Sequence, residues 1–444
     1  MRSDKYRLDK TDGSRENENE NEKACQIFDF ALRILKPLSI NTWTPTPFAN
    51  PTPDRIASSH VFELTKLDTR INSRSVASLN NPPHSGKADV ISLVEGGGFA
   101  ASITVGNQTL QVIVDTGSSD IWVIYPEFKC VDTRSREETA QSECAFGPAY
   151  SVDGNFRQVE GEYLDIKYAD GEILSGVIGT ETVTLAGITL NQTIGLVNYA
   201  GWYGDGVTSG LMGLAYPSLA RARSSQSNQA PVYKPIFTNM YEQGLIDPVF
   251  SMYMTRKGSN AQAAGYLALG GLPPVDIKGR FTSTPILVTQ IAGYAQTYGF
   301  YTIEVGGMTV QNRLLESGGG PGTQYIVDSG TTLNYYPNAV ADAVNAAFNP
   351  PAVYSNDLGA YVVKCDAKPP IHGVIIGGMS LHIGPLDMIV PAGTDRNGNR
   401  VCISGVNAGK VIGEGIYVLG GTFLKNVLAV FDVGAAEMRF ASSR

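Results

Sequence analysis

The sequence predicts a mainly β protein made of two similar lobes. Composition and a repeated motif predict this fold class. Charged residues make up only 17% of the 444 residues, and glycine occurs 49 times, whereas an average soluble protein has roughly 25% charged residues and about 7% glycine. A chain of this length is too long for one small core and suggests two or three domains. We therefore expect a turn-rich, all-β chain in which two halves fold alike.

The repeated motif is an aspartate followed by small polar residues and a glycine. One copy reads VDTGSSDIWV around Asp115, and the other reads VDSGTTLNYYP around Asp328. Each follows a short run of β-branched and aromatic residues, which is typical of a buried strand. The pattern therefore places each aspartate at a strand end, where Gly117 or Gly330 allows a sharp turn.

A second pairing reinforces the duplication. Gly210–Leu214 (GLMGL) and Val418–Gly421 (VLGG) are apolar segments closed by glycine, and each lies about 90 residues after one aspartate motif. Aspartates in turns often only cap local structure, but two matched copies argue against that interpretation. We expect each lobe to supply one aspartate to a shared cleft, with a water molecule between the two carboxyl groups.

Other chemistries find little support in the sequence. The formal net charge of −8 argues against a nucleic-acid partner, which requires a basic field. The chain has no phosphate-binding loop and no nucleophile elbow, and its glycine runs are interpreted as turns or loops. The four histidines show no zinc-ligand spacing, so neither a metal nor a cofactor is expected. They are His60, His84, His372 and His382.

The chain divides into four predicted segments. Residues 1–24 are polar and of low complexity, which predicts disorder. Residues 25–88 include a proline-rich stretch that favours an extended linker, and the family resemblance given below implies that this segment is a propeptide. The N-terminal lobe is placed at 89–270 and the C-terminal lobe at 271–444. The charged start shows no standard signal peptide, and no apolar run is long enough to span a membrane.

Cysteines and sequons favour an oxidising compartment. Cys130 with Cys144, and Cys365 with Cys402, form close-spaced pairs, while Cys25 stands apart. Two local disulfides are expected; the alternative is that all five are buried or free thiols. Candidate glycosylation sequons begin at Asn107 and Asn191. One way to reconcile these features with the charged start is a true N-terminus other than Met1. The family resemblance given below implies an extracellular or acidic vacuolar location.

These motifs together resemble the pepsin-type aspartic peptidases, over roughly residues 89–444. The resemblance implies a bilobal fold with Asp115 and Asp328 as the catalytic pair. It implies hydrogen bonds to that pair from the outer hydroxyls and from the turn glycines of the two loops, which are Ser118, Thr331, Gly117 and Gly330.

The resemblance also implies a flap hairpin that closes over the substrate. Tyr168 matches the flap tyrosine, followed by Asp170 and Gly171, and Trp122 matches the tryptophan that hydrogen-bonds the tyrosine. Without the following turn, Tyr168 would be an ordinary strand tyrosine, and Trp122 an ordinary core residue. Positions that match the family's specificity pocket are apolar, namely Ile113 and Leu211.

Three positions depart from the family's common pattern. Ser209 and Gly421 each stand where an aspartate is common, and Glu172 replaces a common flap serine. These departures affect the expected subsites and leave the catalytic groups intact.

The implied activity is peptide-bond hydrolysis by a water activated between two aspartates, with an acidic pH optimum and a preference for hydrophobic residues. Asp170 adds an expected acceptance of lysine. The expected partners are protein or peptide substrates and pepstatin-like inhibitors, and the expected state is a monomer made as a zymogen. Lys66 and Lys87 are candidates for pairing with the aspartates in the precursor. The alternative is a catalytically silent peptide-binding protein on the same fold.

Overall fold

The computed structural model describes most of the predicted lobes and a short segment before them. The described residues are 57–66, 98–152, 154–168, 170–224, 233–254, 265–277, 279–289, 297–316, 319–395, 397–409 and 416–443. The predicted segment 1–24, most of 25–88, Cys25 and Lys87 lie outside them.

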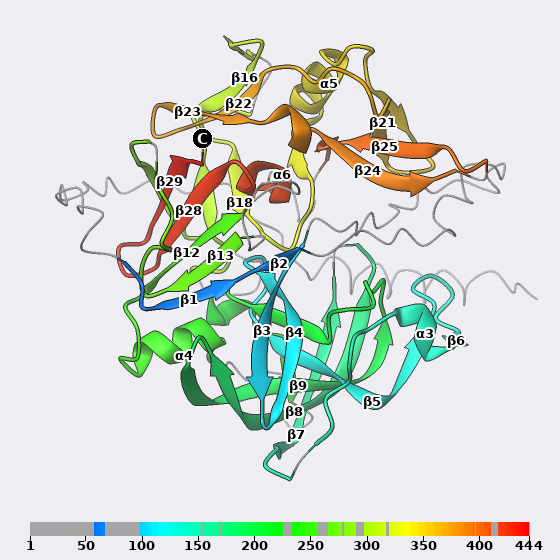
Figure 1. Cartoon of the computed structure of the whole chain (residues 1–444), viewed down its shortest axis with the longest axis vertical. Coiled ribbons are helices and arrows are strands. Elements are labelled where there is room, and N and C mark those ends of the chain that lie inside the picture. The colour runs from blue at the N-terminus through cyan, green and yellow to red at the C-terminus, as the bar shows by residue number, and fades with distance from the viewer. Residues whose placement is uncertain are drawn as a thin grey trace, which may run out of the picture.

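The N-terminal lobe, in the lower half of Figure 1, is a ten-stranded sheet. Its order is β11-β7-β8-β9-β5-β10-β4-β3-β2, with β6 paired to β5. β4 and β8 largely alternate buried residues with more exposed ones, as expected of sheets with one face on a core, whereas β10 is buried throughout. Their bounds are β2 Thr65–Lys66, β3 Phe99–Val105, β4 Gln108–Asp115, β5 Ile121–Val131, β6 Glu138–Thr139, β7 Arg157–Lys167, β8 Ile173–Leu185, β9 Ile188–Gly201, β10 Gly210–Gly213 and β11 Ala222–Ser224; the helices are α3 Gln141–Cys144, η3 Pro217–Leu219 and α4 Ile236–Glu242.

A six-stranded sheet joins the two halves of the chain. Its order is β1-β13-β12-β28-β29-β14, so strands from the middle of the sequence pair with the final hairpin. β1 belongs to the segment predicted to be a propeptide and pairs antiparallel with β13. The bounds are β1 His60–Glu63, β12 Val249–Met254, β13 Gly265–Leu269, β14 Thr282–Pro285, β28 Val427–Asp432 and β29 Glu437–Ser442.

The C-terminal lobe, in the upper half of Figure 1, contains three smaller sheets. The central sheet has the order β15-β18-β27-β19-β26 and carries the second aspartate motif. The bounds are β15 Thr302–Glu304, β16 Gly307–Val310, β17 Arg313–Leu314, β18 Gln324–Val327, β19 Asn334–Tyr336, β20 Val353–Ser355, β21 Ala360–Val363, β22 His372–Ile376, β23 Met379–Ile383, β24 Ile389–Thr394, β25 Arg400–Ser404, β26 Val406–Ala408 and β27 Ile416–Leu419; the helices are α5 Asn338–Ala346, η4 Pro385–Asp387 and α6 Gly421–Leu424.

The two lobes repeat one local arrangement around the aspartate motifs. In the first lobe β4, which ends at Asp115, pairs in parallel with β10. In the second lobe β18, which precedes Asp328, pairs in parallel with β27. Each partner is one of the glycine-closed strands in the sequence. The all-β, two-lobed fold class is thus confirmed.

Aromatic side chains pack where the joining sheet meets the lobes. The rings of Phe250 and Phe431 stack with centroids 4.4 Å apart, and Tyr301 lies edge-on to Phe431 at 4.8 Å. All three are buried, and burying one such ring contributes on the order of 2 kcal/mol. The hydroxyl of Tyr301 also donates to the carbonyl of Leu214 at 2.6 Å, which links the C-terminal lobe to the segment after β10.

Two disulfides stabilise loops, one in each lobe. Cys130, near the end of β5, is bonded to Cys144 in α3, and Cys365 is bonded to Cys402 in β25. These are the two close-spaced pairs of the sequence. Across the ranges given above, every helix is too short or too polar to cross a membrane.

Candidate active site

The two aspartate loops meet between the lobes through hydrogen bonds. The amide of Thr116 donates to Ser329 Oγ at 3.1 Å, and the amide of Ser329 donates to Thr116 Oγ1 at 2.9 Å. The Thr116 hydroxyl donates onward to the carbonyl of Val327 at 2.9 Å, and the Ser329 hydroxyl to that of Val114 at 2.8 Å. Both side chains are buried. This reciprocal set fixes the position of one loop relative to the other.

Asp115 lies at the end of β4 with its carboxyl group held by its own loop. The Gly117 amide donates to Oδ1 at 2.7 Å, and the Ser118 hydroxyl donates to Oδ2 at 2.5 Å. The carboxyl group of Asp328 lies close enough to that of Asp115 to interact with it electrostatically. The first-lobe aspartate is therefore fixed on both oxygens and faces its counterpart.

Asp328 is held in the same way by the second loop. The Gly330 amide donates to Oδ1 at 2.8 Å, and the Thr331 hydroxyl donates to Oδ2 at 2.6 Å. Charge-assisted hydrogen bonds of this kind are shorter and stronger than neutral ones. The structure thus brings together the two predicted aspartates and the four predicted partners in one site.

Burial and proximity set the charge of the pair. Asp115 is only 6% exposed. Loss of solvation raises the pKa of Asp115 well above its ordinary value, and the negative charge of Asp328 raises it further. Hydrogen bonds from Ser118 and Gly117 oppose this rise only partly. One proton on the pair is therefore favoured at acidic pH.

The turn glycines are required by the approach of the two loops. A Cβ atom on Gly117 would lie 2.6 Å from the carboxyl carbon of Asp328, and a Cβ on Gly330 would collide with the carboxyl of Asp115. Any larger residue at either position would displace the opposite aspartate. Here glycine is needed for space as well as for turn geometry.

The predicted flap is the hairpin of β7 and β8, closed by residues 168–172. The Tyr168 amide donates to the Glu172 carbonyl at 2.8 Å, and Gly171 at the tip has a positive φ of 94°. Trp122 Nε1 donates to the Tyr168 hydroxyl at 3.0 Å. The Tyr168 ring also packs against Trp202, with centroids 5.7 Å apart.

The predicted pocket residues lie in one apolar cluster beside the flap tyrosine. Leu211 on β10 pairs in register with both Ile113 on β4 and Trp122 on β5. Trp122 and Leu211 are buried in this cluster, and Ile113 and Tyr168 pack against it while staying partly exposed. The cluster can therefore present an apolar surface next to Asp115.

Several residues of the site carry no strong signal in the sequence. Thr116 and Ser329 follow the aspartates in both motifs, so their matched positions could have suggested a shared role. Trp202 follows β9 without a motif, yet its ring lies 5.2 Å from that of Trp122. Of the departures, Ser209 is buried and Gly421 opens α6, where its amide donates to the Thr331 carbonyl at 2.7 Å.

His84 lies outside the described residues, and the three described histidines belong to no cluster of metal-ligand side chains. His372 is buried, with Nε2 3.1 Å from the Tyr336 hydroxyl and Nδ1 2.8 Å from the Thr309 carbonyl. Burial lowers the pKa of His372 to about 4, so its imidazole is a neutral core group. No cluster of three or more histidine, cysteine or acidic side chains suited to a metal occurs in the part of the chain that the structure describes.

Comparison with known proteins agrees with this geometry. Residues 98–443 match the family model described as eukaryotic aspartyl protease. The chain is 61% identical over 407 residues to a probable aspartic-type endopeptidase of Aspergillus fumigatus, with 92% of each chain covered. It is 29% identical to rhizopuspepsin-2 of Rhizopus niveus, over 92% of this chain and 93% of that one. The chain belongs to the eukaryotic aspartyl protease family.

Proposed function

We propose that this protein is an acid-active endopeptidase in which Asp115 and Asp328 activate a water molecule. The observation that supports this most strongly is the pair of adjacent carboxyl groups, each held on both oxygens by its own loop. Such a pair supplies a base and an acid at the same place.

The proposed reaction uses the shared proton. The ionised carboxylate takes a proton from the water, which attacks the carbonyl carbon of the scissile peptide bond. The protonated carboxyl donates to the oxygen that becomes negatively charged. The pair then donates a proton to the amide nitrogen and takes one from a hydroxyl of the tetrahedral intermediate, which breaks the carbon–nitrogen bond, forms the carboxylic acid product and leaves a single proton on the pair. The two aspartates titrate as a coupled pair, so the role of first base is assigned to the pair and not to one residue.

Hydrolysis of an unfolded protein substrate should be fastest at acidic pH and should disappear in alkaline buffer. The raised pKa of Asp115 keeps one proton on the pair in acid, and that proton is lost as the pH rises through the raised value. Because this folded-state pKa lies above the unfolded one, the same ionisation lowers the stability of the folded state as pH rises. A pH profile of kcat/KM tests this, and undiminished alkaline activity would contradict it.

We also propose a preference for hydrophobic residues beside the scissile bond. Ile113, Leu211 and the ring of Tyr168 belong to one apolar cluster, and Ile113 lies two residues before Asp115 on β4. Closure of the flap over a peptide would exclude water from the site. Peptides with large apolar or aromatic side chains at this position should therefore have the highest kcat/KM.

Asp170→Ser should selectively weaken cleavage after lysine, by roughly tenfold. Asp170 is partly exposed on the flap and accepts a hydrogen bond from the Glu172 amide at 3.0 Å, so its carboxylate can face a cationic side chain. Paired peptides that differ only in lysine or norleucine measure the effect, and the norleucine peptide serves as the control. If the ratio of kcat/KM for the lysine peptide to kcat/KM for the norleucine peptide is the same in the variant and the parent, this role is refuted.

We propose the processing and location of the protein from its disulfides, its sequons and the segment before the first lobe. Two disulfides and exposed sequon residues Asn107 and Asn191 fit a glycosylated protein of an oxidising compartment, either secreted or in an acidic vacuole. The segment before residue 89 is proposed as a propeptide. Lys66 lies in β2, opposite Phe99 of β3.

A further inference from the structure

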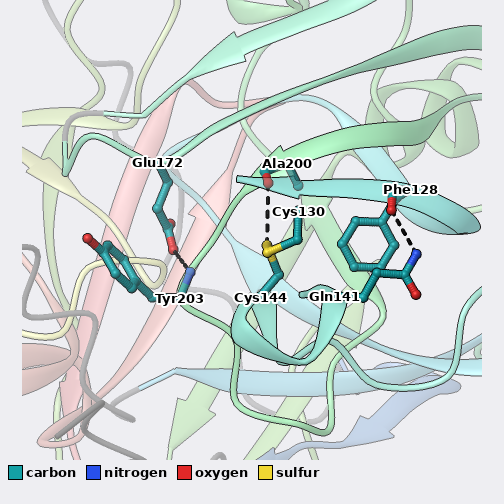
Figure 2. Close-up of a disulfide and its surroundings, with 7 residues drawn as sticks. All are labelled: Phe128, Cys130, Gln141, Cys144, Glu172, Ala200 and Tyr203. Atoms are coloured by element: carbon teal, nitrogen blue, oxygen red, sulfur yellow. Dashed lines mark hydrogen bonds between the residues drawn. A yellow bond between two sulfur atoms is a disulfide. The ribbon is translucent and has the colours of Figure 1, made fainter. Parts of the chain in front are cut away.

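Glu172 is an acidic residue buried under the flap. It lies between the flap tip and β8, and it is only 2% exposed. Its Oε1 accepts a hydrogen bond from the backbone amide of Tyr203 at 2.7 Å, as Figure 2 shows. Tyr203 follows β9 in the segment next to Trp202, whose ring packs on Tyr168. The Glu172 side chain therefore ties the flap turn to the segment that supports the flap tyrosine.

The loop closed by the Cys130–Cys144 disulfide contacts both the flap tip and the segment after β9. Residues 132–137 connect β5 to β6, and the Cys130–Cys144 bond lies at the base of this loop. The hydroxyl of Thr133 hydrogen-bonds that of Tyr203, and Arg136 Nη2 donates to the carbonyl of Gly171 at 3.3 Å. Cys144 Sγ also lies 3.3 Å from the carbonyl oxygen of Ala200 in β9 (Figure 2). The flap tip, the end of β9 and this loop thus form one connected network.

The charges around Glu172 favour its neutral form. Asp170 lies two residues before it on the flap and accepts a hydrogen bond from the Glu172 backbone amide, and the Arg136 guanidinium donates to the Gly171 carbonyl at the flap tip. Burial raises the pKa of Glu172 well above its usual value, and the negative charge of Asp170 adds to the rise. A protonated Glu172 can donate to the Asp170 carboxylate while it accepts from Tyr203, which satisfies both groups.

We propose that Glu172 is a positioning residue that holds the flap, and with it Tyr168, in place over the active site. It acts through hydrogen bonds to the Tyr203 backbone and to Asp170, and it touches neither the substrate nor the catalytic pair. This role rests on the proposed peptidase function. Ionisation of the buried Glu172 carboxyl places a second negative charge beside Asp170, so the flap loosens as the pH rises.

Kinetic variants separate this role from catalysis. Glu172→Ala removes both hydrogen bonds and leaves the Tyr203 amide unpaired, so KM for a peptide should rise about tenfold while kcat changes by less than about threefold. Glu172→Gln keeps an acceptor for Tyr203 and a donor for Asp170 but cannot ionise, so its KM at acidic pH should equal that of the parent. The KM of Glu172→Gln should also stay constant at higher pH, where the KM of the parent rises. Glu160→Ala, at an exposed position of β7, is the charge-matched control and should behave as the parent.

Hydrogen exchange gives a readout that needs no hydrolysis. In the full chain without substrate, the amides of Tyr168 and Tyr203 should exchange at least about tenfold faster in Glu172→Ala than in Glu172→Gln. If the parent cleaves no peptide, the proposed function fails, yet this exchange difference still tests the flap. Parent-like exchange and KM in Glu172→Ala would overturn the proposal. If Glu172→Ala does not fold, a KM in Glu172→Gln that rises with pH as in the parent would overturn it.

Discussion

Asp115→Asn is expected to abolish peptide hydrolysis, with kcat lowered by at least about 1,000-fold. Asparagine has nearly the same size, and its amide oxygen can still accept from the Gly117 amide while its NH2 group donates to the Ser118 hydroxyl, which turns round to accept. It cannot share an acidic proton with Asp328, so the two residues can no longer exchange the roles of general base and general acid. Initial rates on a fluorogenic peptide at acidic pH measure the loss.

Two controls accompany this variant. Asp165→Asn makes the same chemical change at an exposed position of β7 and should leave kcat unchanged. Thermal unfolding of Asp115→Asn should resemble that of the parent at acidic pH, because burial already favours the neutral form of Asp115. Activity that survives in a folded Asp115→Asn protein would show that this residue is not part of the catalytic pair.

Gly117→Ala should lower kcat by about 100-fold. The added methyl group would lie 2.6 Å from the carboxyl carbon of Asp328, so this carboxyl must move away from Asp115. Movement breaks its hydrogen bonds to the Gly330 amide and the Thr331 hydroxyl, and a displacement of about 1 Å in a reacting group can cost roughly 100-fold in rate.

Gly279→Ala is the matched control for that substitution. A Cβ atom there would lie 3.9 Å from its nearest neighbour, the Ser442 amide nitrogen, so the variant should keep parental kcat and stability. Gly117→Ala should bind substrate with nearly unchanged KM, because the flap and pocket are untouched. A kcat within about twofold of the parent would mean that the loops tolerate a wider separation than the structure shows.

The duplicated motif made much of the fold predictable. Asp115 and Asp328 each follow a short apolar run and precede a glycine, and these are local features that a strand and a sharp turn require. Because the same order recurs, two similar lobes with one aspartate each could be expected. The glycine-closed strands after each motif were predictable for the same reason, and they lie beside the aspartate strands as parallel neighbours.

Contacts between distant segments were not predictable in the same way. The bonds between Thr116 and Ser329 join residues 213 positions apart, and they depend on how the lobes meet. Trp202 supports the flap tyrosine only because the end of β9 pairs alongside the start of β8. Glu172 was visible in the sequence as a departure from the family's pattern, but its burial and its bond to the Tyr203 amide depend on the packing of three separate segments.

The pairing of β1 also depends on tertiary structure. His60–Glu63 is four residues long and lies in a segment predicted to precede the first lobe. It pairs with β13, about 200 residues later, at the edge of the sheet that joins the lobes. Nothing in so short a run specifies which edge it joins, because strand pairing at this distance is decided by the completed sheet.

The most direct test is hydrolysis of an unfolded protein at acidic pH, with and without pepstatin. We expect the processed protein to cleave the substrate into peptides and to lose this activity when pepstatin is added, because such an inhibitor occupies the site between Asp115 and Asp328. A correctly folded, processed protein that binds pepstatin but cleaves no protein or peptide at any acidic pH would contradict the proposed catalysis.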